Sequence, residues 1–196
     1  MSNNNLVTPI GNVVYAWIKN EEIIRKDGKD VPTGKYSITV SFSEEETNQL
    51  NEEINKVWAD FLENNKQGKE FNLTKFVVPT RTLNEQTCFV FRKNVSIISK
   101  ETNLPVKLYV PIFDSENKNC TKNVVGIGRD SQVKISYTLL PFYMNANNYG
   151  VSLRLQAIQL IKLVPIVSNG SRYGFSEVTD GYVAPNVDDG ELEIPY

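Results

Sequence analysis

The 196-residue chain contains no histidine. This absence excludes histidine general bases, Ser-His-Asp and Cys-His catalytic arrangements, and most zinc and iron sites. Cys88 and Cys120 are the two cysteines, and because no Cys-x-x-Cys spacing joins them we expect neither a metal knuckle nor a redox pair. Cys88 lies in an apolar run, which predicts a small buried hydrophobe. The sequence therefore predicts no cofactor, no metal ion and no enzymatic activity.

Long apolar runs are also missing. No stretch approaches the roughly 20 apolar residues that a membrane-spanning helix needs. The first residues, MSNNNLVTPIGN, have neither the basic nor the apolar region of a secretory signal, so we expect the protein to stay in the cytoplasm and to avoid membranes. A hydrophobic share of 40% with 22% charged residues predicts a folded domain with a real core.

Basic residues are absent from the last 22 positions, which carry six acids. Residues 1–174 therefore hold 17 acids against all 21 bases. Seven of those acids, with Lys56 as the one base, fall in residues 43–63, so the remaining body has 20 bases against 10 acids. We predict a basic domain over residues 1–174 and an acidic, extended tail over residues 175–196, an arrangement that suits binding to a polyanion.

One helix is predicted, over residues 43–63. Ser43 followed by Glu46 has the spacing of a capping box. Apolar residues then recur on one helical face, which we expect to pack on the core: Leu50, Ile54, Val57, Trp58, Phe61 and Leu62.

Most of the other ordered stretches are predicted strands, because they alternate and are rich in β-branched and aromatic residues. They are VVYAWIK, GKYSITVSF, TCFVFRKNV, VKLYVPIF, SQVKISYTLLPFYM and GVSLRLQAIQLIKLV. In the first, alternation sets Val14, Ala16 and Ile18 against Val13, Tyr15, Trp17 and Lys19. The pattern leaves open whether Phe89 and Phe91 face the core. Six strands with one inserted helix indicate a small antiparallel barrel or sandwich.

The segment GIGRDS is followed by a strand pattern rather than a helix. A dinucleotide-binding fingerprint requires the helix. Gly126 and Gly128 are therefore interpreted as turn residues, and a nucleotide site is not expected.

Aromatic and basic side chains share the expected outer faces of several strands. Rings stack on unpaired bases and cations follow the phosphate backbone, so this mixture is typical of a groove for single-stranded nucleic acid. The alternative is that the rings form a second hydrophobic layer and the cations are only solvated. Taken as a set, the residues favour stacking by Tyr15, Trp17 and Tyr109, and phosphate contacts by Lys19, Lys35, Arg92, Lys93, Lys107, Arg129, Lys134 and Arg154.

A flexible acidic tail can occupy a cationic groove and compete with DNA. Release by DNA would expose the final Ile194-Pro195-Tyr196 as an apolar contact for other proteins. The alternative is a terminus that only increases solubility.

The run VVGIGRDSQVKISYTLLPFYMNANNYGVSLRLQAIQLIKLV, with GFSEVTDGY and an acidic, aromatic-ended tail after it, resembles the C-terminal half of phage-encoded single-stranded DNA-binding proteins with an OB-fold core. The resemblance covers about a third of the chain. It implies an OB-like antiparallel β-barrel that coats single-stranded DNA during phage replication and recombination in the cytoplasm of the bacterial host.

The resemblance further implies that the tail recruits replication partners such as polymerase and helicase and supports dimerisation. The tail residues carried over as docking elements are Asp188, Asp189, Glu191, Glu193 and Tyr196. This tail ends in Pro-Tyr and is less densely acidic than strong examples of the family, so its partner and its competition with DNA stay open.

Two other functions fit parts of the sequence. A structural or assembly β-sandwich protein of a virion would use the exposed rings as a protein interface. A carboxylate-dependent nuclease would need a cluster of acids at strand ends, whereas these acids fall mainly on the helix and in the tail. Oligomeric state, site size, cooperativity and preference between DNA and RNA stay open.

Overall fold

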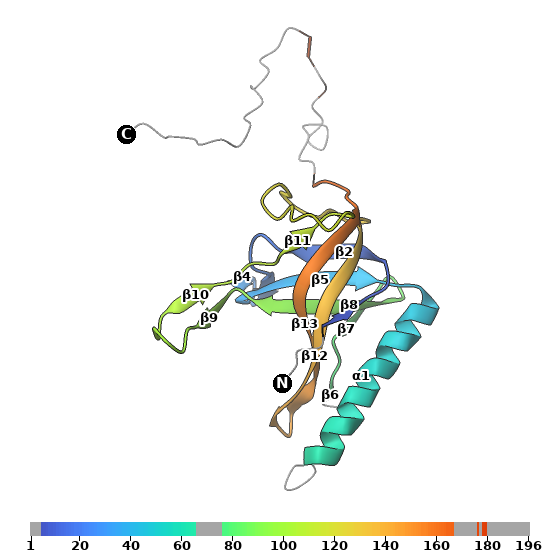
Figure 1. Ribbon diagram of the computed structural model, residues 1–196, viewed down its shortest axis with the longest axis vertical. Coiled ribbons are helices and arrows are strands. Elements are labelled where there is room, and N and C mark those ends of the chain that lie inside the picture. Colours follow the sequence, from blue (N-terminus) through green and yellow to red (C-terminus); the bar gives the residue numbers. More distant parts are fainter. Residues whose placement is uncertain (1–4, 66–75, 167–175, 177, 180–196) are drawn as a thin grey trace. The chain divides into compact units, whose positions relative to one another are not determined.

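The structure is a computed structural model that describes residues 5–65, 76–166, 176, 178 and 179 (Figure 1). It contains one helix, α1 (Glu44–Asn65), in these residues, and its strands are β1 (Leu6–Val7), β2 (Gly11–Trp17), β3 (Ile23–Lys26), β4 (Lys29–Pro32), β5 (Lys35–Ser41), β6 (Phe76–Val77), β7 (Thr80–Leu83), β8 (Gln86–Asn94), β9 (Ser96–Ile98), β10 (Pro105–Lys107), β11 (Ile112–Phe113), β12 (Gln132–Asn145) and β13 (Asn148–Lys162).

Five strands close into a ring. β2 pairs with β5, β5 with β8, β8 with β13, β13 with β12, and β12 returns to β2. Four of these junctions are antiparallel, and β13 runs parallel to β8. A ring leaves few unpaired strand edges, as in OB-type barrels. The prediction of a mainly β, OB-like barrel with one inserted helix is confirmed.

The barrel interior is filled by alternate residues of each strand. On β5 the inward residues Tyr36, Ile38 and Val40 are buried as predicted, but the outward Ser37, Thr39 and Ser41 are buried as well, so β5 is covered on both sides. Phe89 and Phe91 are both fully buried, which resolves the choice that the sequence left open. Cys88 is buried as expected.

The helix begins with the predicted capping box. The Ser43 backbone N–H donates to Glu46 Oε2 at 3.0 Å, and the Glu46 N–H donates to Ser43 Oγ at 3.3 Å. Leu50, Ile54 and Trp58 are its buried residues. The Trp58 ring stacks on Tyr149 of β13, with ring centroids 5.6 Å apart, so Trp58 is a core residue as predicted. Figure 1 shows α1 running beside β6 and the far end of the β12–β13 hairpin.

The predicted alternation on β2 is wrong at one residue. A β-bulge between Val13 and Tyr15 turns Val13 toward the core, opposite Val40, while Tyr15 and Trp17 face outward. Val13 and Tyr15 therefore do not share a face. A bulge adds one residue to one strand, and regular alternation cannot reveal it.

The single strand predicted from VKLYVPIF is also wrong. Its first residues form β10 in a hairpin with β9, whereas Ile112 and Phe113 form β11 and pair with β13. Pro111 has no N–H to donate between the two pieces. The short strands β1, β3, β4, β6, β7 and β9 were not predicted.

Gly128 acts as a close-approach residue in GIGRDS. Its N–H donates to Val164 O at 2.8 Å, and an added Cβ would lie 2.5 Å from that oxygen. The segment is followed by strand β12 rather than by a helix, as the sequence predicts. The chain divides into two units, Met1–Ile166 and Val167–Tyr196. The predicted domain boundary at 174 lies outside the described residues, and so does the acidic tail apart from residues 176, 178 and 179, including Asp188, Asp189, Glu191, Glu193 and Tyr196.

Candidate nucleic-acid interface

A row of outward side chains crosses four neighbouring strands. Trp17 of β2 pairs with Ser37 of β5, Ser37 pairs with Arg92 of β8, and Arg92 pairs with Arg154 of β13. Directly paired residues lie on the same face of a sheet. With a strand spacing of about 4.8 Å, the row spans about 14 Å from ring to outer cation. We call the outward side of β2, β5, β8 and β13 the outer face.

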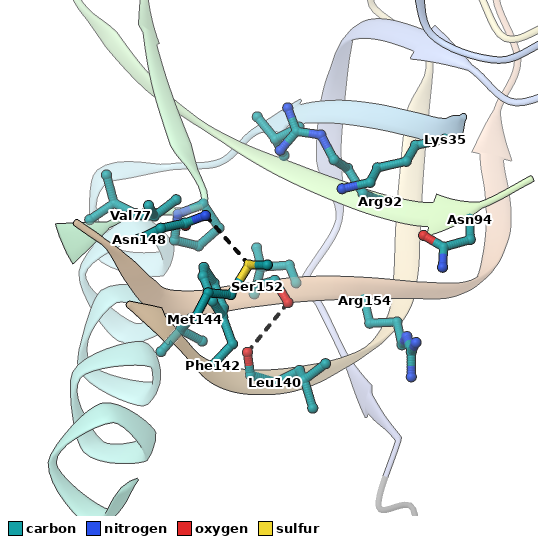
Figure 2. A pocket seen from close by; sticks show the side chains of 15 residues that line it. Lys35, Val77, Arg92, Asn94, Leu140, Phe142, Met144, Asn148, Ser152 and Arg154 are labelled. Atoms are coloured by element: carbon teal, nitrogen blue, oxygen red, sulfur yellow. Dashed lines mark hydrogen bonds between the residues drawn. The ribbon is translucent and has the colours of Figure 1, made fainter. Parts of the chain in front are cut away.

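A groove of about 430 Å³ lies on this face and on the adjoining hairpin. Figure 2 shows its cationic end, with Lys35, Arg92 and Arg154, and its apolar end, with Phe142 and Met144. Leu140 and Met144 are exposed, although both are large and apolar. Among the described residues Lys35 and Arg154 form no ion pair, so their charges face the groove unneutralised. We call this hollow the β8–β13 groove.

The three predicted stacking rings are all accessible. Tyr15, Trp17 and Tyr109 are 51%, 38% and 65% exposed, whereas a second hydrophobic layer would have covered them. Tyr15 and Trp17 also line a hollow of about 450 Å³ between β2 and residues 125–129, where Arg129 lies. This hollow is largely apolar apart from Lys19, Asn20 and Arg129.

Lys107 and Tyr109 line a different hollow of about 320 Å³, together with Lys19 and Tyr36. Lys19 borders both this hollow and the one beside Trp17. Its ammonium group donates to the backbone oxygen of Thr121, which ties it to the loop after β11. The predicted residues are therefore distributed over linked hollows rather than one cleft.

Two predicted cations lie apart from these hollows. Lys93 is on the opposite side of β8 from Arg92, and its ammonium group donates to Gln156 O at 3.4 Å. Partial burial, together with the nearby Arg154 charge, lowers the pKa of Lys93. Lys134 pairs with Gln159 on β13 and lines none of the hollows described here. Both stay predictions as DNA-contacting residues.

The sequence reasoning missed a charge cluster beside the groove. The carboxylate of Glu22 lies 3.2 Å from Arg81 Nη2 and 3.5 Å from Arg92 Nε. Arg81 lies on the short strand β7, and the four residues TRTL are too few for a periodic pattern. Phe142 and Met144, at the apolar end of the groove, lie in a predicted strand but are not among the predicted DNA-contacting residues.

Within the described ranges, no group of three or more Cys, Asp and Glu side chains is placed to hold a metal ion. No helix found in them has both the length and the apolar character needed to span a bilayer.

Several solved structures share this fold. The single-stranded DNA-binding protein gp2.5 of bacteriophage T7 superposes with a TM-score of 0.61 at 21% identity, over 84% of this chain and 94% of that one. The single-stranded DNA-binding protein of bacteriophage Enc34, solved in complex with single-stranded DNA, gives 0.56 at 9% identity, over 85% and 91% of the two chains. The same Enc34 protein in a second structure gives 0.56 at 10% identity, over 89% and 92%.

This chain has the fold of phage single-stranded DNA-binding proteins. The resemblance seen in residues 123–164 is thereby confirmed at the level of the fold, and it extends over most of the chain. No protein-family model and no curated protein matches the sequence.

Proposed function

We propose that this protein is a non-enzymatic, sequence-tolerant single-stranded DNA-binding protein that coats DNA during phage replication and recombination in the host cytoplasm. The observation that carries the proposal is the row of Trp17, Arg92 and Arg154 across the outer face. The solved structures with a similar fold give the second line of support, since the phage T7 and Enc34 proteins are single-stranded DNA-binding proteins.

The chemistry of the outer face suits an unpaired strand. Bases that are not paired can stack on the exposed Tyr15 and Trp17 rings, while phosphates meet Lys35, Arg92 and Arg154. The apolar end of the β8–β13 groove offers Phe142 and Met144 to further bases. Ring faces and point charges do not distinguish one base from another, so binding is sequence-tolerant.

Titration with an oligo-dT strand tests this proposal through tryptophan fluorescence. Trp17 is exposed and Trp58 is buried, so saturable quenching is expected to come from Trp17 and to disappear in Trp17→Phe. Log affinity should fall with log salt by about 0.7 per phosphate contacted. An affinity that does not change with salt contradicts the cationic interface. Absence of saturable binding favours the virion structural alternative.

The tail completes the proposal. Residues 175–196 compete with DNA for the cationic surface, and the freed tail docks replication proteins such as polymerase and helicase through Asp188, Asp189, Glu191, Glu193 and Tyr196. Support comes from the six acids without a base in this segment. Deleting residues 175–196 should tighten oligo-dT binding and abolish capture of those partners, and unchanged or weaker DNA binding contradicts the competition. Sedimentation of both forms tests whether the tail also holds a homodimer.

A further inference from the structure

Glu22 is an acid held in place beside a cationic surface. The residue is 6% exposed and follows the end of β2. Its N–H donates to Lys35 O at 2.7 Å, and its carbonyl accepts from the Thr33 N–H at 2.9 Å. These two bonds fix the Glu22 backbone between β5 and the end of the β3–β4 hairpin, so the direction of its side chain is constrained.

The carboxylate contacts two arginines from different strands. Oε1 accepts from Arg81 Nη2 of β7, and Oε2 accepts from Arg92 Nε of β8. The two arginine side chains are 44% and 35% exposed, whereas that of Glu22 is 8% exposed. A guanidinium has five N–H donors. Each arginine thus uses one donor on Glu22 in these contacts and keeps others on its exposed side.

The position of this cluster links it to the interface. Arg92 belongs to the row across the outer face and lines the β8–β13 groove. Ser37 and Thr39 point outward on β5 and yet are almost completely buried. Other parts of the protein therefore cover the outer face at these two residues. Two guanidinium groups on one carboxylate leave a net positive charge. The cluster therefore still attracts phosphate, while its carboxylate limits the rotamers of both cations.

We propose that Glu22 is a positioning residue for DNA binding, which holds Arg81 and Arg92 with their exposed N–H groups toward the phosphates of a bound strand. Arg81 is then a phosphate-contacting residue of the same interface. This inference rests on the proposed function. The competing explanation is purely structural: Glu22 joins β7 and β8 and, toward DNA, acts only as a repelling charge.

The two explanations predict opposite changes in oligo-dT affinity for the Glu22→Gln variant. If Glu22 only repels DNA, removing its charge tightens oligo-dT binding. If it positions the arginines, two ordered phosphate contacts are lost, so oligo-dT binding weakens and the log–log salt slope decreases by up to about 1.4, that is, about 0.7 for each contact. A tenfold rise in salt would then weaken the variant about 25-fold less than the wild type.

Glu21→Gln is the matched control. It removes the same unit of charge one residue away, and the Glu21 carboxylate accepts from the Gly34 N–H rather than from an arginine. We expect Glu21→Gln to leave the slope unchanged and to bind oligo-dT as tightly as, or slightly more tightly than, the wild type. A Glu22→Gln variant that behaves like Glu21→Gln overturns the positioning role.

Arg81→Gln tests the second part of the proposal, the assignment of Arg81 as a phosphate-contacting residue. This test still applies if circular dichroism shows that Glu22→Gln fails to fold. We expect the Arg81→Gln slope to decrease by about 0.7, and an unchanged slope overturns the assignment of Arg81. The wild-type titration separates this inference from the proposed function. Failure of the wild type to bind oligo-dT removes both, whereas normal wild-type binding with unaltered variants removes only the inference.

Discussion

Two groups of aromatic rings in this barrel differ in what covers them. Beside α1, Trp58 packs with its ring centroid 5.4 Å from Phe61, 5.0 Å from Phe76 and 5.6 Å from Tyr149. On the outer face and the adjoining loop, Tyr15, Trp17 and Tyr109 are exposed. The first group is packed between α1, which carries Trp58 and Phe61, and the strands β6 and β13, whereas the part of the chain that the structure describes leaves the second group open.

Residue type alone therefore does not assign a ring to the core or to a ligand. An aromatic side chain is stabilised by leaving water, whether it packs on its own chain or on a base. The helix-side rings have already gained this burial. The exposed rings can be buried only when another molecule binds, and the nearby cations favour an anionic molecule.

The largest expected effect is on stability, from Trp58→Ala. Removing a buried ring leaves a cavity, so the free energy of unfolding should fall by about 3–5 kcal/mol. Urea denaturation measures it. Trp17→Ala, on the exposed side, should change the same quantity by less than about 1 kcal/mol. Similar losses for both variants would show that the exposed ring is also a core residue.

The next effect is on binding, from Trp17→Ala. Loss of one stacked base should weaken oligo-dT binding by about 1–3 kcal/mol while the fold is retained. Fluorescence anisotropy of labelled oligo-dT measures this without relying on tryptophan. Unchanged affinity would remove Trp17 from the interface.

A smaller effect is expected for Tyr137→Phe. The Tyr137 hydroxyl donates to Glu53 Oε2 of α1 at 2.9 Å, and burial, followed by this hydrogen bond and the Glu53 charge, raises the pKa of Tyr137 well above its usual range. We expect the variant to lose about 1 kcal/mol of unfolding free energy near neutral pH.

Because the folded-state pKa of Tyr137 is raised, its contribution is complete below about pH 10, the ordinary tyrosine value, and decreases as pH rises above it. The gap between wild type and Tyr137→Phe should therefore narrow as pH rises above about 10 in urea denaturation. Tyr109→Phe, an exposed control, should show no such gap. A gap that widens with pH would contradict this linkage.

The smallest expected effect is a difference in the salt slope of oligo-dT binding between variants of two cations, Arg154 and Lys134. Arg154→Gln removes a groove cation and should reduce the salt slope of oligo-dT binding by about 0.7. Lys134 is predicted from the sequence to contact DNA but lines none of the described hollows, so Lys134→Gln should reduce the slope by less than Arg154→Gln does. Equal changes would mean that net charge, rather than the groove, governs binding.

Much of the fold could be predicted because its elements have strong local signals. The capping box at Ser43 and the alternation of Tyr36, Ile38 and Val40 depend only on neighbouring residues. The bulge beside Val14 could not be predicted, since it depends on the partner strand β5. Short strands such as β7 contain too few residues to show a period, and pairing with β8 decides them.

The candidate site was predicted in its residue types but not in its grouping. Lys35, Arg92 and Arg154 are far apart in sequence, and the closed barrel brings them to one groove. Arg81 and Glu22 were missed because an ion pair across 59 residues has no local sequence signal. Conversely, the consecutive cations Arg92 and Lys93 do not reveal from the sequence which one faces outward.

The sequence alone determined that one helix and a set of half-buried strands would form, and that the body would be basic and lack histidine chemistry. These properties follow from composition and from short-range periodicity, which any segment carries within itself. Tertiary packing sets which rings are buried between α1 and the barrel, which cations share a groove, and that Glu22 contacts Arg81 and Arg92. Barrel closure sets those relations, because strand register places residues from distant segments side by side.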